Sequence, residues 1–325
     1  MRTRALLLVL ALTACSRAAD STDETPESDP ATTTATVETK PAGDPEGTVT
    51  HHSLTIDGHE RTYRLYVPRA TPDGPMPLFI GLHGGTGWAD QLARTDHIEG
   101  LAESNGFVVV HPDGVKVAGG PCGVWNGGMC CGVAARDEID DVAFVDALID
   151  EISADQEIDP HRTFAYGHSN GGIMSYRLAC ELGDRIVGIG VVAGTLGIET
   201  CDPAQPVSLL HVHGTADENL PIAGGVGPRS IAGVDFPPPT DGFATLADQD
   251  GCPDAEEIAD PGSDVTVTRR QPCDGGTAAT FVTIEGASHA WPGGTPRATP
   301  PSGAGYAGYD ATAEIVAFLL DHPRP

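Results

Sequence analysis

From about residue 50 onward, short and continuously apolar runs alternate with segments of helical periodicity. Five of these runs end in glycine or a small polar residue, and they read PLFIGLHG, GFVVVHPDG, RTFAYGHS, IVGIGVVAG and VSLLHVHG. Continuous hydrophobicity is typical of strands that are buried on both faces, as in a parallel sheet. Upstream, LTIDGHERTYRLYV predicts a hairpin, because Asp57-Gly58 separates two β-like runs.

Helical segments are predicted between the strands, at Asp137–Ser153, Asn170–Leu182, Thr240–Gln249 and Ala311–Leu320. The first of them begins with acidic residues, which suits the positive end of a helix dipole. Strands that alternate with helices predict an α/β fold, with a mostly parallel sheet covered by helices on both faces. The Gly- and Pro-rich stretch Pro221–Asp241 lacks any periodicity and is a candidate for a loop over the substrate.

The N-terminus has the pattern of an export signal. In MRTRALLLVLALTAC a basic flank precedes a short apolar stretch and then small residues, too short to remain as a membrane-spanning helix. Leu12-Thr13-Ala14-Cys15 resembles a bacterial lipobox, in which the cysteine becomes the lipid-modified first residue. We therefore predict a lipoprotein signal peptide at residues 1–14 and lipidation at Cys15. The alternative is an ordinary signal peptide with an unrelated cysteine.

Residues 15–49 are rich in Thr, Pro, Asp and Glu and contain almost no large apolar side chains. Such a segment cannot bury enough surface to fold, so we expect a disordered acidic tether. The catalytic domain is expected at residues 50–325, at the cell envelope or outside the cell. The formal net charge of −28 makes nucleic acid an unsuitable partner, because phosphate contacts require Lys and Arg.

The motif G-x-S-x-G occurs once where a strand gives way to a helix, with Ser169 between Gly167 and Gly171. A short glycine motif is weak evidence by itself. Here, however, a buried-strand candidate precedes it and a helical pattern follows it, which is the context that a nucleophile elbow requires. We therefore predict that Ser169 is a catalytic nucleophile.

A serine nucleophile needs a histidine base and an acid that orients it, and in α/β-hydrolases these follow in the order Ser, acid, His. Four of the twelve histidines follow the serine, namely His211, His213, His289 and His322. Only His289 lies in a loop directly after a strand and beyond a suitable acid. Asp217, at the end of VSLLHVHGTAD, is that acid, with Asp202 as the weaker alternative.

Acyl transfer also needs hydrogen-bond donors for the oxyanion. One candidate is the backbone N–H of Asn170, directly after the nucleophile. The other lies in the loop of FIGLHGGTG, where we favour the Gly85 amide and place Thr86 next. His83 is expected to hold this loop in place through its ring nitrogens.

Taken together, these motifs resemble an extracellular esterase family that joins polyhydroxybutyrate depolymerases to feruloyl and acetylxylan esterases. The resemblance runs from about residue 53 to the end and rests on LHGGTG, WNGGMCCG with RDEIDDVAFV, GHSNGG, HGTAD, GPRS and SHAWPGG. It implies an α/β-hydrolase fold with Ser169, Asp217 and His289 as its triad, and the lipid-anchored bacterial members are the most similar. The chain lacks the substrate-adsorbing domain usual in dedicated polymer depolymerases, which favours soluble ester substrates.

The expected function is therefore a secreted serine carboxylic-ester hydrolase acting on short-acyl or hydroxycinnamoyl esters, without cofactor or metal. Four alternatives stay open: a depolymerase of short polyhydroxyalkanoates, a cell-envelope acyltransferase, a peptidase, and a binding lipoprotein without activity. Trp88, Trp125 and Trp291 lie in loops that flank the predicted site and are candidates for substrate contact.

Seven cysteines follow Cys15, and an exported protein is expected to oxidise them. We predict the bridges Cys252–Cys273 and Cys180–Cys201. Cys122 would then pair with Cys130 or Cys131, which leaves one thiol over. Zinc is a minor alternative for these cysteines. The acidic residues at 137–141 lack the spacing of a calcium loop and are explained by a first helical turn.

Overall fold

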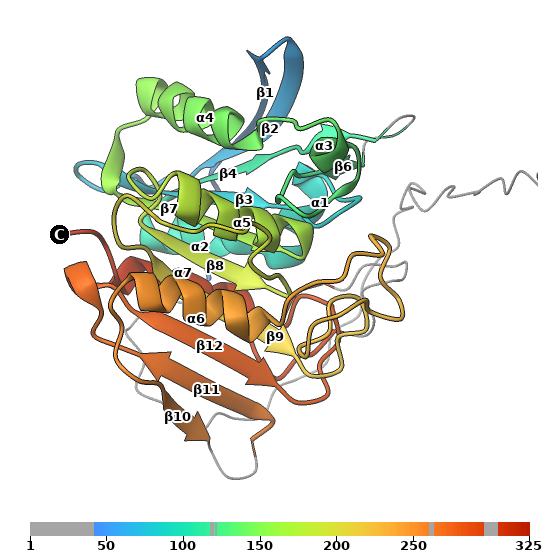
Figure 1. Cartoon of the computed structure of the whole chain (residues 1–325). Helices are drawn as coiled ribbons and strands as arrows, with labels where there is room; N and C mark the ends of the chain where they lie inside the picture. Colours follow the sequence, from blue (N-terminus) through green and yellow to red (C-terminus); the bar gives the residue numbers. More distant parts are fainter. Residues whose placement is uncertain (1–41, 118–119, 121, 260–262, 296–304) are drawn as a thin grey trace, which may run out of the picture.

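A ten-stranded sheet forms the centre of the computed structural model (Figure 1), which describes residues 42–117, 120, 122–259, 263–295 and 305–325. In spatial order its strands are β1 (Thr48–Ile56), β2 (His59–Val67), β4 (Val108–Pro112), β3 (Met76–Leu82), β7 (Ile158–His168), β8 (Gly188–Val192), β9 (Ser208–Gly214), β12 (Ala279–Ile284), β11 (Val265–Arg270) and β10 (Glu256–Ala259). The short strands β5 (Val115–Lys116) and β6 (Gly123–Val124) pair separately.

The six strands from β4 to β12 in this order run parallel, and an antiparallel pair closes each edge of the sheet. The predicted hairpin is the first of these pairs. Asp57 and Gly58 form its turn with φ angles of 50° and 78°, which is the left-handed backbone of a type I′ turn. Most side chains of β1 are exposed, and β10 at the opposite edge has only four residues.

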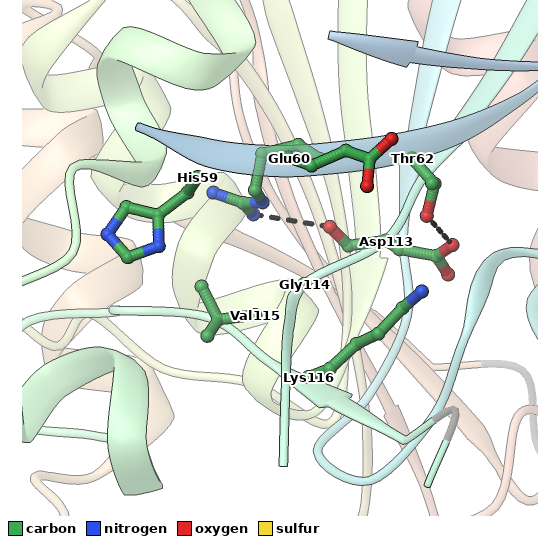
Figure 2. A pocket seen from close by; sticks show the side chains of 8 residues that line it. His59, Glu60, Thr62, Asp113, Gly114, Val115 and Lys116 are labelled. Carbon is green, nitrogen blue, oxygen red and sulfur yellow. Dashed lines mark hydrogen bonds between the residues drawn. The ribbon is translucent and has the colours of Figure 1, made fainter. Parts of the chain in front are cut away.

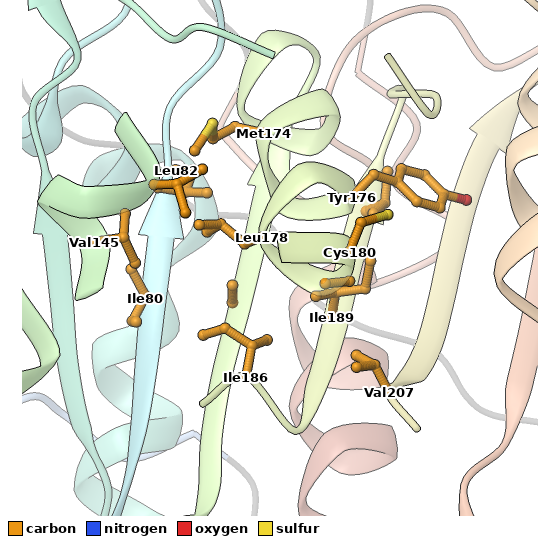
Figure 3. Packing of buried hydrophobic residues seen from close by; sticks show 14 of the residues in the cluster. Ile80, Leu82, Val145, Met174, Tyr176, Leu178, Cys180, Ile186, Ile189 and Val207 are labelled. Atoms are coloured by element: carbon orange, nitrogen blue, oxygen red, sulfur yellow. The ribbon is translucent and has the colours of Figure 1, made fainter. Parts of the chain in front are cut away.

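Helices cover both faces of the sheet, as the sequence predicts. One face carries α1 (Ala89–Asp96), α2 (Ile98–Asn105) and α7 (Ala311–Asp321), and the other carries α4 (Asp141–Asp155), α5 (Asn170–Glu181) and α6 (Pro239–Gln249). Each face has its own apolar core. Figure 3 shows part of the core under α4, α5 and α6, to which Leu178 of α5, Ile80 of β3 and Ile186 all belong.

The strands predicted in the centre of the sheet and the four predicted helices are all present. Helix α4 begins at Asp141 rather than Asp137, because Asp140 caps it by accepting a hydrogen bond from the Ala143 amide at 2.9 Å. The remaining helices were not predicted: α1, α2 and the five-residue α3 (Gly132–Arg136). His97, with φ of 54°, separates α1 from α2 and interrupts the periodicity that would have revealed them.

Both predicted bridges are present, Cys180–Cys201 and Cys252–Cys273. The first joins the last turn of α5 to the segment after β8, so the helix that follows Ser169 is covalently held at its far end. The predicted leftover thiol is wrong, because no cysteine of the described residues is free. The predicted pairing of Cys122 with Cys130 or Cys131 is also wrong, because Cys130 is bonded to the adjacent Cys131.

The predicted signal peptide and Cys15 lie outside the described residues, as does most of the tether, whose last residues include the start of β1 at Thr48. Within the described part of the chain, no helix combines the length and apolar character needed to cross a bilayer.

Asp250, at the end of α6, is a buried carboxyl group whose side chain is 4% exposed. Its Oδ2 accepts a hydrogen bond from the Val207 amide at 2.9 Å. Burial raises the pKa of Asp250 to about 7, although the hydrogen bonds from Val207 and Thr277 act in the opposite direction. Between about pH 4 and pH 7, the Asp250 carboxyl is therefore protonated in the folded state and ionised in the unfolded state.

We predict that Asp250 makes the protein less stable as the pH rises from about 4 to about 7, because the folded-state pKa lies above that of a free carboxyl. Asp250→Asn retains an oxygen acceptor for Val207 and carries no charge. It should raise the free energy of unfolding at pH 8 by up to about 4 kcal/mol and change it little at pH 4, because the folded-state pKa of about 7 lies about 3 above the ordinary value of 3.8 and each pKa unit corresponds to about 1.4 kcal/mol. Urea denaturation measures this, with the exposed Asp254→Asn as control. Equal effects of Asp250→Asn at both pH values would contradict the assignment.

Candidate active site

Ser169 occupies a sharp turn between the end of β7 and the start of α5. Its φ of 55° and ψ of −119° are unfavourable for a residue with a side chain. The side chain is partly exposed, unlike its neighbour Asn170, which is buried. A strained serine at a strand–helix junction has the backbone form of the predicted nucleophile elbow.

The glycines around Ser169 are required because α5 passes very close to the sheet. A Cβ atom on Gly171 would lie 2.0 Å from the carbonyl oxygen of Leu82 in β3. A Cβ atom on Gly167 would lie 2.4 Å from the Gly171 backbone. At Gly172 the nearest neighbour is the end of the Val191 side chain, at 3.1 Å. The first turn of the helix thus rests directly on the strands, and this contact fixes the height of Ser169 above the sheet.

Ser169, His289 and Asp217 form one hydrogen-bonded series, although they lie far apart in the sequence. His289 Nε2 is 2.8 Å from Ser169 Oγ, and His289 Nδ1 is 2.6 Å from Asp217 Oδ2. A carboxylate can only accept, so Nδ1 carries the ring proton and Nε2 is left to accept the serine hydroxyl proton. Asp217 and His289 follow β9 and β12, which are neighbouring parallel strands.

The carboxylate of Asp217 is held in its charged form despite being 4% exposed. Burial alone would raise its pKa, but the charge and hydrogen bond of His289, together with the nearby His213 and the Leu220 amide, lower the net pKa below the ordinary value. Its Oδ1 accepts hydrogen bonds from the amides of Asn219 and Leu220 at 2.8 and 2.9 Å. Asp202, the weaker candidate acid, is exposed beside the Cys180–Cys201 bridge.

The glycine loop after β3 lies beside the elbow. Cβ atoms on Gly84 and Gly85 would lie 3.5 Å from Ser169 Cβ and 3.7 Å from Asn170 Cβ, respectively. The Thr86 amide donates to the Gly123 carbonyl at 2.9 Å, so it is already committed. Within the described residues the Gly85 amide has no such acceptor, which favours Gly85 over Thr86 as an oxyanion donor.

Trp125 is fully buried and holds this loop and the elbow together. Its indole Nε1 donates to the His83 carbonyl at 2.9 Å, and its backbone N–H and C=O pair with the side-chain amide of Asn170. His83 accepts the Gly114 amide at Nε2 and donates from Nδ1 to the Gly84 carbonyl. His83 therefore fixes the loop through both ring nitrogens, as expected. The prediction that the Trp125 indole contacts substrate is wrong, because the ring has no exposed surface.

Trp291 also packs inside the protein rather than at a substrate-binding surface. It is 3% exposed, and its Nε1 donates to Thr312 Oγ1 at 3.0 Å, so the predicted substrate contact is wrong for this ring too. It supports the His289 loop together with His168, whose Nε2 donates to the His289 carbonyl at 2.7 Å. His168 was not predicted, although it directly precedes the serine in the GHS motif. Of the three tryptophans, Trp88 alone is partly exposed.

A buried ion pair anchors the segment that carries Trp125. Asp141 Oδ1 accepts from Arg61 Nη2 at 2.6 Å, and its Oδ2 accepts from the Asn126 amide at 2.7 Å. Arg177 of α5 donates to the Asn126 carbonyl at 2.8 Å. The sequence explains the acidic run at 137–141 as a helical first turn alone and gives no sign of this second role of Asp141.

A hollow of about 160 Å³ lies between β2 and the segment 113–116, and its lining side chains are drawn in Figure 2. The backbone carbonyl of Asp113 accepts a hydrogen bond there from Arg61, and its carboxylate Oδ2 accepts one from the Thr62 hydroxyl. Its other carboxylate oxygen accepts the Ala89 amide at the start of α1. None of Ser169, Asp217 and His289 lines this hollow, so it is separate from the candidate active site.

Residues 61–235 match the family model described as esterase PHB depolymerase, which is more than half of the chain. The chain belongs to this family. A Nocardia uniformis subsp. tsuyamanensis protein assigned as an esterase, NocK, is 30% identical over 80% of this chain and 78% of its own length. Feruloyl esterase B of Piromyces equi is 32% identical over 68% of this chain and 40% of its own length. Feruloyl esterase C of Emericella nidulans is 33% identical over 55% and 62%, respectively.

Solved structures of esterases share the fold of this family member. An acetyl xylan esterase from Aspergillus awamori matches with a TM-score of 0.55 at 13% identity, over 74% of this chain and 94% of its own. The S-formylglutathione hydrolase from Agrobacterium tumefaciens matches with a TM-score of 0.50 at 14% identity, over 76% and 90%. At such identities the likeness establishes the fold, which is that of an α/β-hydrolase. Family and fold together make the chain a carboxylic ester hydrolase.

We predict that Gly171→Ala is far more damaging than Gly172→Ala. The first places a methyl group 2.0 Å from a backbone carbonyl oxygen, a distance that requires the backbone to move, whereas the second meets Val191 Cγ1 and the Gly167 carbonyl oxygen at 3.1 and 3.2 Å, which shifts of a few tenths of an ångström relieve. Urea denaturation should show a loss above about 3 kcal/mol for Gly171→Ala and below about 2 kcal/mol for Gly172→Ala. Similar losses for the two variants would mean that the helix does not rest on β3 as described.

Proposed function

We propose that this esterase is a serine hydrolase in which Ser169 is the nucleophile, His289 the general base and acid, and Asp217 the group that orients the imidazole. The observation that carries the proposal is the unbroken series of contacts, 2.8 Å from Ser169 Oγ to His289 Nε2 and 2.6 Å from His289 Nδ1 to Asp217 Oδ2. A serine hydroxyl is a weak nucleophile until such a base accepts its proton.

In the proposed reaction, Ser169 Oγ attacks the ester carbonyl carbon while its proton moves to His289 Nε2. The bond from carbon to the alcohol oxygen then breaks, and the imidazolium returns the proton to that oxygen. A water molecule attacks the acyl-enzyme in the same manner, and the acid and free Ser169 are regenerated. The lowered pKa of Asp217 keeps it ionised throughout, so that it stabilises the positive charge that develops on His289.

The amides of Asn170 and Gly85 are the proposed oxyanion donors. Asn170 is the first residue of α5, where backbone N–H groups have no partner within the helix and the helix dipole favours negative charge. Gly85 lies beside it with an amide that no described residue engages. Two donors on adjacent segments can bind one oxyanion only if the segments keep a fixed relative position. The hydrogen bonds between Trp125 and the Asn170 side chain provide this.

For the substrate we propose soluble esters with a short acyl or hydroxycinnamoyl group. Two of the similar proteins are named feruloyl esterases, and the name of a bifunctional relative from Neocallimastix patriciarum includes acetylxylan esterase. Trp88, at the start of α1 and partly exposed, is the tryptophan that can still contact such a group.

Ser169→Ala should lower kcat for p-nitrophenyl acetate by at least about 10⁴-fold, because no other group forms the acyl-enzyme. The variant should keep the melting temperature of the parent or exceed it, since alanine loses only the partly buried hydrogen bond to His289 and no packing contact. A fluorophosphonate probe should label the parent and not the variant. Turnover or labelling retained in Ser169→Ala would remove the serine from the mechanism.

The same parent enzyme, assayed side by side with methyl ferulate, acetylated xylan and hydroxybutyrate oligomers, identifies the substrate class. We expect the first two to be cleaved faster than the oligomers. Adding an alcohol acceptor and analysing the products separates hydrolysis from acyl transfer.

We further propose that the enzyme is exported and held at the cell envelope by a lipid on Cys15. The support is the lipobox-like LTAC and the Pro-, Thr- and acid-rich composition of residues 15–49, which suits a tether. Disulfides in the folded domain agree with an oxidising compartment.

Cys15→Ser should release the protein from the membrane fraction. The parent, expressed with its own N-terminus in a bacterial host, should partition into the detergent phase and incorporate labelled palmitate. The variant should do neither, while its esterase activity per molecule stays within about twofold of the parent, because the residue lies far from the folded domain in the sequence. Unchanged partitioning would contradict lipidation.

A further inference from the structure

Behind Asp217 lies a buried row of polar side chains to which the proposed mechanism gives no role. Tyr176 Oη is 2.9 Å from His211 Nδ1, and His211 Nε2 is 3.1 Å from His213 Nδ1. His213 Nε2 is 2.9 Å from the Leu220 carbonyl oxygen and 3.5 Å from Asp217 Oδ2. The side chains of Tyr176, His211 and His213 are at most 1% exposed. Burying three adjacent polar side chains costs folding free energy unless each is fully hydrogen-bonded, so we looked for a function of this arrangement.

The acceptor at the end of this row fixes the direction of every hydrogen bond in it. A carbonyl oxygen only accepts, so His213 Nε2 must carry the proton, and a neutral ring then accepts at Nδ1. His211 must therefore donate from Nε2 and accept at Nδ1, where the Tyr176 hydroxyl is the donor. The row has one proton arrangement, and it points toward Leu220 and Asp217.

Electrostatics agree with two neutral rings. Burial lowers the pKa of His211 well below its ordinary value, and the adjacent His213 adds to this effect. Burial also lowers the pKa of His213, although the charge of Asp217 and the Leu220 hydrogen bond oppose it. Neutral imidazoles are what the single proton arrangement requires.

The elements that carry the row explain why it can position the acid. His211 and His213 are two residues apart on one face of β9, where His211 stacks on Phe281 with ring centroids 4.5 Å apart. The Tyr176 ring extends from α5 toward this strand (Figure 3). Helix α5 also begins directly after Ser169. The row therefore connects α5, the helix that follows Ser169, to the loop that carries Asp217. His289 makes a separate connection between Ser169 and Asp217.

We propose that Tyr176, His211 and His213 are positioning residues for the catalytic centre, holding the loop Asp217–Leu220 at the height where Asp217 Oδ2 meets His289 Nδ1. His213 Nε2–H donates to the Leu220 carbonyl oxygen, while the Leu220 amide donates to Asp217 Oδ1. The loop is thus fixed through both backbone groups of one residue. This inference rests on the proposed function, because it assigns the row a role only if Asp217 and His289 act on Ser169.

The test compares conservative variants in the full-length enzyme with p-nitrophenyl acetate. Tyr176→Phe removes one hydroxyl and should lower kcat about tenfold with KM within twofold of the parent, because the acid is misplaced and substrate binding is untouched. His213→Leu should lower kcat at least thirtyfold. His213→Gln can still donate to the Leu220 carbonyl and should recover to within about fivefold of the parent.

A matched control separates positioning from general stability. Tyr66→Phe removes the hydroxyl of another tyrosine whose ring is buried, bonded to Glu103 Oε2 at 2.6 Å in a partly buried position on the other face of the sheet, and should leave kcat and KM unchanged. Melting temperatures of all variants are measured in parallel. Ser169→Ala in the same assay tests the proposed function separately, because retained activity there would refute the mechanism itself.

Parental kcat in Tyr176→Phe and His213→Leu, with Ser169→Ala inactive, would overturn the positioning role and leave the serine mechanism standing. So would a folded His213→Gln that is as impaired as His213→Leu, since the donated hydrogen bond would then not matter. A fall in kcat for Tyr66→Phe equal to that for Tyr176→Phe would show that any buried hydroxyl has this effect, and would overturn it as well.

Discussion

The close contact between the first turn of α5 and the strands beneath it is the constraint on which the rest of the site depends. With 2.0 Å between a notional Gly171 Cβ and the Leu82 carbonyl, only glycine permits this approach. The contact lifts Ser169 into a backbone conformation that side chains rarely adopt, and it brings the amide of Asn170 beside the glycine loop. The glycines have this effect only because the buried strands offer a rigid surface, so site and core are specified together.

Around this contact, polar side chains that are buried or partly buried form hydrogen bonds that link separate segments of the chain. Trp125 joins the glycine loop to Asn170, His168 joins the elbow to the His289 loop, and Asp141 ties Arg61 to the segment at Asn126. Each of these bonds links two segments that are distant in the sequence. Loops supply the reacting groups, and these hydrogen bonds give the loops the rigidity that loops usually lack.

Features set by local chemistry could be predicted from the sequence, whereas those set by tertiary contacts could not. The Asp57-Gly58 turn, the buried strands and the strand–serine–helix junction follow from neighbouring residues alone. Chain order singled out the histidine and aspartate that the structure brings to Ser169. The same rule excluded His211 and His213 as the catalytic base, and in the structure His289 is the histidine that contacts Ser169. Chain order gives no information about the contact of His213 with the Asp217 loop. Trp125 and Trp291 were assigned to the surface because the burial of an indole depends on segments far away in the chain.

The two edges of the sheet limit how copies of the protein can pair with one another. A long, flat, apolar edge strand invites pairing with another molecule and leads to aggregation. Here the outer strand on one side, TVTHHSLTI, is polar and exposed along most of its length, and the strand on the other side is the four-residue EEIA with two glutamates. Neither edge offers a template for a further strand. The formal net charge of −28 adds electrostatic repulsion between copies of the chain to this lack of an edge template.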